Sequence, residues 1–145
     1  MIIKQFRFWF FVALPLLLGG LIYILFRAES LKMFTWFEAM GLSDFIKNIR
    51  KARVFSVPEW VIFSLPDALW LFSFSNIMLI LWGYKLSKQS IIWIFAAPII
   101  GLISEFGQAV SVVPGTFDLL DLIFLFFASI LPFIIFNKTI NYEKF

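Results

Sequence analysis

The chain has 145 residues, 62% of them hydrophobic and only 14% charged, with a formal net charge of +3. Soluble domains are about half apolar and about a quarter charged, so this composition excludes a separate water-soluble domain. The absence of Cys and His excludes disulfides, thiolate nucleophiles and histidine bases. We therefore expect an all-α integral membrane protein that forms a single membrane domain over residues 1–145, with no nucleic-acid partner.

The first apolar run, residues 8–26, is long enough to cross the roughly 30 Å hydrocarbon core of a bilayer as a helix. Lys4 and Arg7 precede it, as basic residues precede the apolar part of a signal peptide. No A-x-A-like cleavage site follows the run, which is longer than the apolar part of most signal peptides. We therefore expect an uncleaved span.

Residues 28–65 are expected to form an interfacial segment with one or two amphipathic helices. Residues 31–40 place apolar side chains mainly on one side, Gly41 is a stop signal, and Ser43 is a candidate cap for a second helix. Neither helix is long or apolar enough to span, so we expect both to lie at the lipid headgroups. A lid over a site, or an anion-binding surface, is the alternative. The basic residues expected to contact headgroups are Lys47, Arg50, Lys51 and Arg53.

The second span is expected at residues 67–84. The sequence SVPE at 56–59 resembles a capping box, which predicts that a helix begins there. Pro66 is expected to divide this helix into an interfacial turn and the span, with Ser64 as the N-cap of the second part. Asn76 lies in the middle of the span, where we expect it to hydrogen-bond to another helix.

The third and fourth spans are expected at residues 91–110 and 119–136, joined by a short turn at Pro114-Gly115. The fold class is thus four transmembrane helices with one or two interfacial amphipathic helices between the first and second spans. Lys and Arg lie near span ends on the side of the termini, and the last connection has none. The positive-inside rule then favours a multi-pass cell-membrane protein with both termini in the cytoplasm.

Alternating spans bring five polar residues to one side of the bilayer, where they form a candidate ligand-binding site or polar network. These residues are Asp67, Glu105, Gln108, Asp118 and Asp121.

The acids differ in how well local structure explains them. Asp118 is a good N-cap, and Asp121 in the first turn suits the positive end of the helix dipole. Asp121 also shares a helix face with small residues, so we expect it to point into the bundle. Glu105 lies near a helix C-terminus, where the dipole disfavours an anion. It therefore requires a partner, a proton or a polar pocket.

Three motifs resemble the VanZ-like family of bacterial membrane proteins: Pro66-Asp67, an E-x-x-Q beginning at Glu105, and a Pro-Gly turn that leads into a D-x-x-D beginning at Asp118. The resemblance covers roughly residues 66–132. Three positions depart from the family pattern, because this chain has Leu71, Thr116 and Leu125 where members often have His, Arg and Asn. The resemblance implies a divergent bacterial cell-envelope protein and does not imply a reaction.

Three classes of function remain open from the sequence. The first is a binding protein whose outward-facing acidic pocket recognises a polar or cationic ligand, a lipid headgroup or a partner protein of the membrane or envelope. The second is a structural subunit of a membrane complex, whose acids pair with Arg50, Lys51 or Arg53. The third is an enzyme acting on a lipid-linked substrate through a divalent cation. The first two classes require no cofactor. In the third class, the ligands of the divalent cation would be Asp67, Glu105, Asp118 and Asp121.

Overall fold

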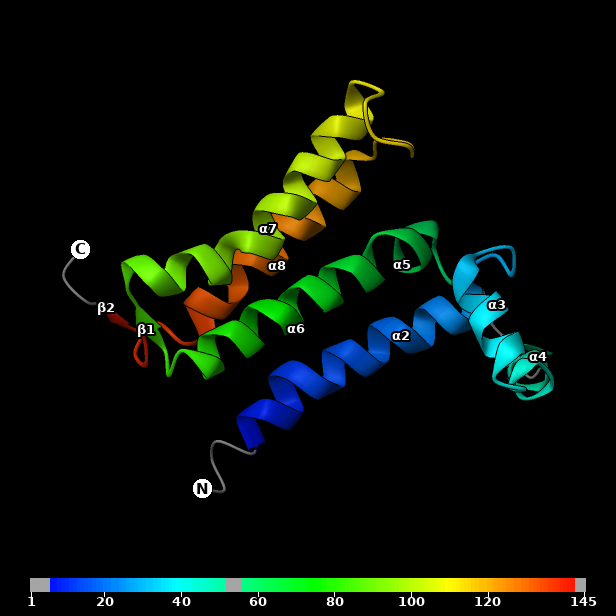
Figure 1. Cartoon of the computed structure of the whole chain (residues 1–145), viewed down its shortest axis with the longest axis horizontal. Helices are drawn as coiled ribbons and strands as arrows, with labels where there is room; N and C mark the ends of the chain where they lie inside the picture. Colours follow the sequence, from blue (N-terminus) through cyan, green and yellow to red (C-terminus); the bar gives the residue numbers. More distant parts are fainter. Residues whose placement is uncertain (1–5, 52–55, 143–145) are drawn as a thin grey trace.

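The computed structural model describes residues 6–51 and 56–142. Over these residues the fold is mostly helical, as expected, with one pair of two-residue strands added (Figure 1). The elements in chain order are η1 (Trp9–Ala13), α2 (Leu14–Phe26), α3 (Lys32–Ala39), α4 (Ser43–Lys51), α5 (Glu59–Phe63), α6 (Leu65–Leu81), β1 (Lys85–Leu86), α7 (Lys88–Ala109), α8 (Leu119–Ile135) and β2 (Asn141–Tyr142).

Two helical stretches are long and apolar enough to cross a membrane. One is Phe6–Phe26, which joins η1 to α2, and the other is Lys88–Ala109, which is α7. The helices α6 and α8 are apolar and have 17 residues each. All four are built from long runs of Leu, Ile, Phe and Trp that are uninterrupted by charge except near their ends.

The helix bounds differ from the expected spans mainly around the connection of α6 to α7. α6 begins at Leu65 and ends at Leu81, whereas the expected span was 67–84. It ends early because Gly83 and Tyr84 both adopt positive φ values, 60° and 58°, which a helix does not allow. α7 begins three residues before the expected 91–110, because Ser87 and Ser90 form a reciprocal capping box.

The helix α6 lies between α2 on one side and the α7–α8 pair on the other (Figure 1). The contact with α2 is close at Gly19, where an added Cβ would lie 2.6 Å from Nε1 of Trp70. The same Trp70 nitrogen donates a hydrogen bond to the backbone carbonyl of Leu16, at 3.3 Å. Because Gly19 has no side chain, the indole of Trp70 can reach the backbone of α2.

Both described ends of the chain lie at one end of the bundle. There β1 pairs in parallel with β2, Lys85 opposite Asn141. The guanidinium of Arg7 lies 5.7 Å from the ring centre of Tyr84 and 5.3 Å from that of Phe136, distances typical of cation–π contacts. The helices α3 to α5 and the connection from α7 to α8 lie at the other end (Figure 1).

At that other end, Arg50 of α4 caps the C-terminus of α2. Its guanidinium donates to the backbone carbonyls of Ile24 and Arg27, and it forms an ion pair with Glu29 at 3.2 Å. The last carbonyls of a helix lack intrahelical donors and carry partial negative charge, so a guanidinium there is favourable. This contact ties α4 to the first long helix.

Three local expectations are wrong. The helix at 56–59 begins only at Glu59, because Pro58 occupies the N-cap position and no side chain caps it. Ser64 precedes α6 but adopts helical backbone angles rather than the extended ones a cap requires, and its hydroxyl has no partner. Asn76 donates to the carbonyl of Phe72 at 2.7 Å, within its own helix. The interhelical bond expected of Asn76 is made instead by Ser73.

Candidate functional site

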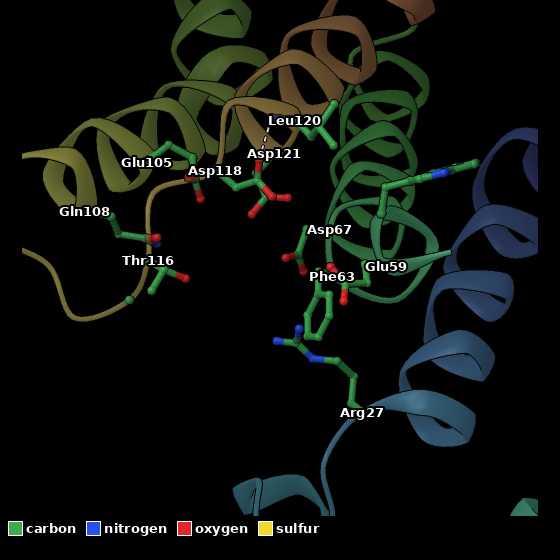
Figure 2. Close-up of a pocket in the computed structure, with 12 residues that line it drawn as sticks. Arg27, Glu59, Phe63, Asp67, Glu105, Gln108, Thr116, Asp118, Leu120 and Asp121 are labelled. Carbon is green, nitrogen blue, oxygen red and sulfur yellow. Dashed lines mark hydrogen bonds between the residues drawn. The ribbon is translucent and has the colours of Figure 1, made fainter. Parts of the chain in front are cut away.

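A pocket of about 440 Å³ opens at the end of the bundle where α6 and α8 begin and α7 ends (Figure 2). All five polar residues singled out from the sequence line it. These are Asp67, Glu105, Gln108, Asp118 and Asp121. They come from α6, α7, α8 and the connection before α8. Because α7 runs in the opposite direction to α6 and α8, its C-terminal end lies beside their N-terminal ends (Figure 1).

Glu105 is the least solvent-exposed carboxylate of the pocket. Its residue is only 8% exposed, and its Oε2 is buried with no hydrogen-bond partner. The backbone N–H of Asp118 faces this carboxylate from the start of α8. Because α7 ends four residues later, its negative dipole end adds to the charge of Glu105 rather than offsetting it.

Gln108 follows Glu105 by three residues and lies beside the returning chain. A Cβ at Gly115 would lie 2.8 Å from Cδ of Gln108, and Gly115 has a φ of +140°. Only glycine therefore suits this position in both space and backbone angle. The turn closes over the Gln108 amide and holds it at the pocket wall.

The two acids of α8 play different local roles. Asp118 caps the helix as the sequence predicted, since its Oδ1 accepts from the backbone N–H of Leu120 at 2.8 Å. Asp121 lies in the first turn, half-buried, and its Oδ1 is buried without a partner. Capping thus accounts for Asp118, whereas Asp121 turns an unsatisfied oxygen toward the interior at the pocket.

Asp67 occupies the opposite wall. It lies in the first turn of α6, directly after Pro66, where the positive end of the helix dipole favours a carboxylate. Its side chain is exposed in the pocket and faces the carboxylates of α7 and α8 (Figure 2).

Seven lining residues were not identified as site residues from the sequence: Arg27, Glu59, Trp60, Phe63, Gly115, Thr116 and Leu120. The guanidinium of Arg27 lies 5.1 Å from the ring centre of Tyr23 and 5.0 Å from that of Phe63. Glu59 and Phe63 are four residues apart in α5, so they share a helix face. The signal that could have located Arg27 is its position immediately after the first long helix.

Of the basic residues proposed as structural partners, the two that the structure describes, Arg50 and Lys51, form no ion pair with these acids. Arg50 is engaged by the end of α2 and by Glu29, and its guanidinium lies 5.2 Å from the ring centre of Phe34. Lys47 and Lys51 are exposed on α4. Arg53 lies outside the described residues. Within the described chain, no Lys or Arg forms an ion pair with Asp67, Glu105, Asp118 or Asp121.

The same four acids were the candidate ligands for a divalent cation. As they are placed, no three Asp or Glu side chains of residues 6–51 and 56–142 are grouped closely enough to hold a metal ion. The pocket is wider than a metal site, and its charge is spread over several walls. Among its described lining residues are five carboxylates, one guanidinium and two aromatic rings.

This arrangement suits a positively charged organic group. Carboxylates offer charge-assisted hydrogen bonds to an ammonium, and the ring of Trp60 is a negative surface that attracts cations, whereas the ring of Phe63 already faces the guanidinium of Arg27. Comparison with family models, with curated proteins and with solved structures finds no match to this chain.

Proposed function

We propose that this chain is a multi-pass helical membrane protein in which α6 and α8 cross the bilayer together with the two longer helices. Seventeen residues at about 1.5 Å each give about 25 Å, at the lower limit for a span. Large apolar side chains are exposed along all four helices, among them Leu17, Leu81, Ile100 and Phe127, each 65% or more exposed. Contact of this apolar surface with water is unfavourable, whereas contact with lipid acyl chains is not.

We propose further that the acidic pocket binds the cationic group of a ligand. The observation that carries this proposal is Glu105, a carboxylate with 8% exposure and an oxygen that lacks a partner, placed among four other acids. An ionised group at such a position requires a counter-charge. No basic residue of the described chain supplies one by direct ion pairing, so an ammonium from outside completes the site.

The pocket also supports the resemblance to VanZ-like membrane proteins. The three motifs that carry this resemblance lie at separate helix ends along the sequence, and their polar residues Asp67, Glu105, Gln108, Asp118 and Asp121 line the one pocket. On this basis we propose a divergent VanZ-like envelope protein whose motif residues form a binding site, with the pocket facing outward and both termini in the cytoplasm.

The test is binding of choline and ethanolamine to the purified chain in maltoside micelles, followed as a shift in unfolding temperature. A ligand at concentration L that binds the folded state alone stabilises it by RT ln(1 + L/Kd), so the unfolding temperature rises with the logarithm of the ligand concentration above the Kd. Glycerol and acetate, which carry no positive charge, are expected to leave it unchanged. The cation effect should weaken with added salt, as expected for interactions between charges.

The decisive variant is Glu105→Gln, which keeps the shape of the side chain and removes its charge. It should insert and purify normally and lose the response to choline. Glu38→Gln, which removes an exposed carboxylate of α3 outside the pocket, should respond like the unmodified protein. An unchanged response in Glu105→Gln would overturn the assignment of the pocket.

A further inference from the structure

A second cavity adjoins the acidic pocket and differs from it in polarity. It is a groove of about 520 Å³ with α6 as its floor and α2 and α7 as its walls. The apolar side chains that line it include Leu16, Trp70, Phe74, Ile77, Ala97 and Ile100. Among the described residues that line it, Ser73 alone has a hydroxyl, which already donates to the carbonyl of Val12 at 2.8 Å.

The two cavities meet at Asp67, which lines both of them. A ligand that fills them together must therefore change from polar to apolar at this residue. From Asp67 to Ile77 the groove follows α6 for ten residues, which is about 15 Å of helix. That length is about half of the 30 Å hydrocarbon core, so the groove has the reach of one lipid leaflet.

The groove is open on its walls as well as at its end. Leu16 on α2 is 47% exposed and Ile100 on α7 is 67% exposed, so the apolar lining is accessible from the side of the bundle. In a bilayer this side faces acyl chains. A chain can enter the groove laterally while its headgroup stays at the level of the acidic pocket.

The charges of the pocket specify the headgroup. Five carboxylates and the ring of Trp60 suit an ammonium. Arg27 lies across the pocket from Glu105 (Figure 2); its positive charge acts on Asp67, but no carboxylate of the described residues forms a direct ion pair with its guanidinium. A guanidinium pairs well with phosphate, and this separation of charges matches a headgroup that carries both an ammonium and a phosphate.

We propose that the pocket and the groove together hold one zwitterionic phospholipid, with its ammonium among Asp67, Glu105 and Asp121, its phosphate near Arg27, and one acyl chain along α6. This inference rests on the proposed function, since it names the class of ligand that brings the cationic group. It adds a lipid anchor that a soluble ammonium compound lacks.

The experiment compares three probes by native mass spectrometry of the full chain released from maltoside micelles. Lysophosphatidylethanolamine carries the ammonium, the phosphate and a chain. Lysophosphatidylglycerol has the same chain and phosphate but no ammonium, and glycerophosphoethanolamine has the headgroup without a chain. We expect lysophosphatidylethanolamine to bind at least about tenfold more tightly than either of the other two probes. Lysophosphatidylglycerol lacks the ion pair of the ammonium, and glycerophosphoethanolamine lacks the buried methylenes of the chain.

Two variants separate the groove from the pocket. Ile100→Trp narrows the groove and should weaken lysophosphatidylethanolamine about tenfold, with glycerophosphoethanolamine unchanged. Ile103→Trp is its control, because Ile103 is 63% exposed on the same helix and lines neither cavity. Leu16→Trp, on the facing wall, repeats the test should Ile100→Trp lower the unfolding temperature.

The outcomes are distinguishable. Equal affinity for lysophosphatidylethanolamine and glycerophosphoethanolamine, with no effect of either groove variant but loss in Glu105→Gln, would overturn the lipid inference and leave the cation pocket standing. Equal affinity for the two lysolipids, unaffected by Glu105→Gln, would overturn the proposed function as well. Absence of binding by all three probes would also overturn both.

Discussion

The hydroxyl of Ser73 in α6 donates a hydrogen bond to the backbone carbonyl of Val12 in η1, at 2.8 Å, and both residues are buried. The π-helical turn Trp9–Ala13 precedes Pro15, which has no N–H to donate into the helix. Disturbed helix turns of this kind need partners for freed backbone groups, and in membranes neighbouring Ser side chains supply them. This single contact therefore links an irregular turn of the first helix to the central helix.

Ser73→Ala should lower stability by about 1 kcal/mol, the scale of interhelical hydrogen bonds in membrane proteins. Ser75→Ala is the matched control, because the hydroxyl of Ser75 is equally buried and has no hydrogen-bond partner. Removing an unsatisfied hydroxyl is neutral or stabilising. Thermal unfolding in micelles measures both, and equal losses in the two variants would show that the bond to Val12 contributes nothing.

Gly19→Ala should destabilise the contact between α2 and α6 by about 1–3 kcal/mol, because the new Cβ would lie 2.6 Å from Trp70 and 3.1 Å from the carbonyl of Pro66. Gly20→Ala provides the comparison, since its Cβ would meet no atom within 4 Å. Alanine is the better helix former, so Gly20→Ala should be neutral or slightly stabilising. A Gly19→Ala protein as stable as Gly20→Ala would contradict this account of the interface.

Glu105→Gln should raise the unfolding temperature of the ligand-free protein. A carboxylate at this position, beside Asp121 and Asp67, destabilises the fold because it is desolvated and repelled by the other two. The neutral amide removes both effects, which should raise the free energy of unfolding by about 1 kcal/mol. A pocket that is destabilised when empty is common in binding sites. If Glu105 instead neutralised a buried cation, the variant would unfold earlier or disappear from the membrane. Membrane abundance and unfolding temperature, measured together, separate the two cases.

Asp118 allows capping to be separated from charge. Asp118→Asn keeps an acceptor for the N–H of Leu120 and should leave stability nearly unchanged. Asp118→Ala removes the acceptor and should cost about 1 kcal/mol of helix stability. Equal stability of the Asn and Ala variants would show that the cap is not important. A loss of cation binding in the Asn variant as large as in Glu105→Gln would give Asp118 a direct role in the pocket.

The arrangement of helix ends predicts a labelling pattern. The chain has no native Cys, so single cysteines report position directly. Asn48→Cys in α4 and Val112→Cys in the connection before α8 should react with a membrane-impermeant maleimide in intact cells. Asn137→Cys, at the end where β1 and β2 pair, should react only after permeabilisation. Reaction of Asn48→Cys and Val112→Cys from opposite sides would overturn the four-span topology.

Local sequence was sufficient where neighbouring residues determine the structure. The long apolar runs predicted helices close to the observed α2, α7 and α8, and Gly41 ended α3 through its positive φ. Asp118 was identified as a cap because the cap bond is made to a residue only two positions away. Where capping patterns competed with backbone conformation, as at Ser64, the sequence pattern was misleading, since helical angles there leave the hydroxyl unable to cap.

The sequence by itself determined a helical, strongly apolar chain and the position of its acids near helix ends, because composition and periodicity are properties of single segments. Only the tertiary structure decided that Asp67 lines two cavities, that Arg27 joins the acidic pocket and that Arg50 does not. These relations depend on how the helices approach one another; the approach of η1 and α2 to α6, for example, is set by the contacts of Gly19 with Trp70 and of Ser73 with Val12. Such contacts join residues more than fifty positions apart, and no local pattern of the chain encodes them.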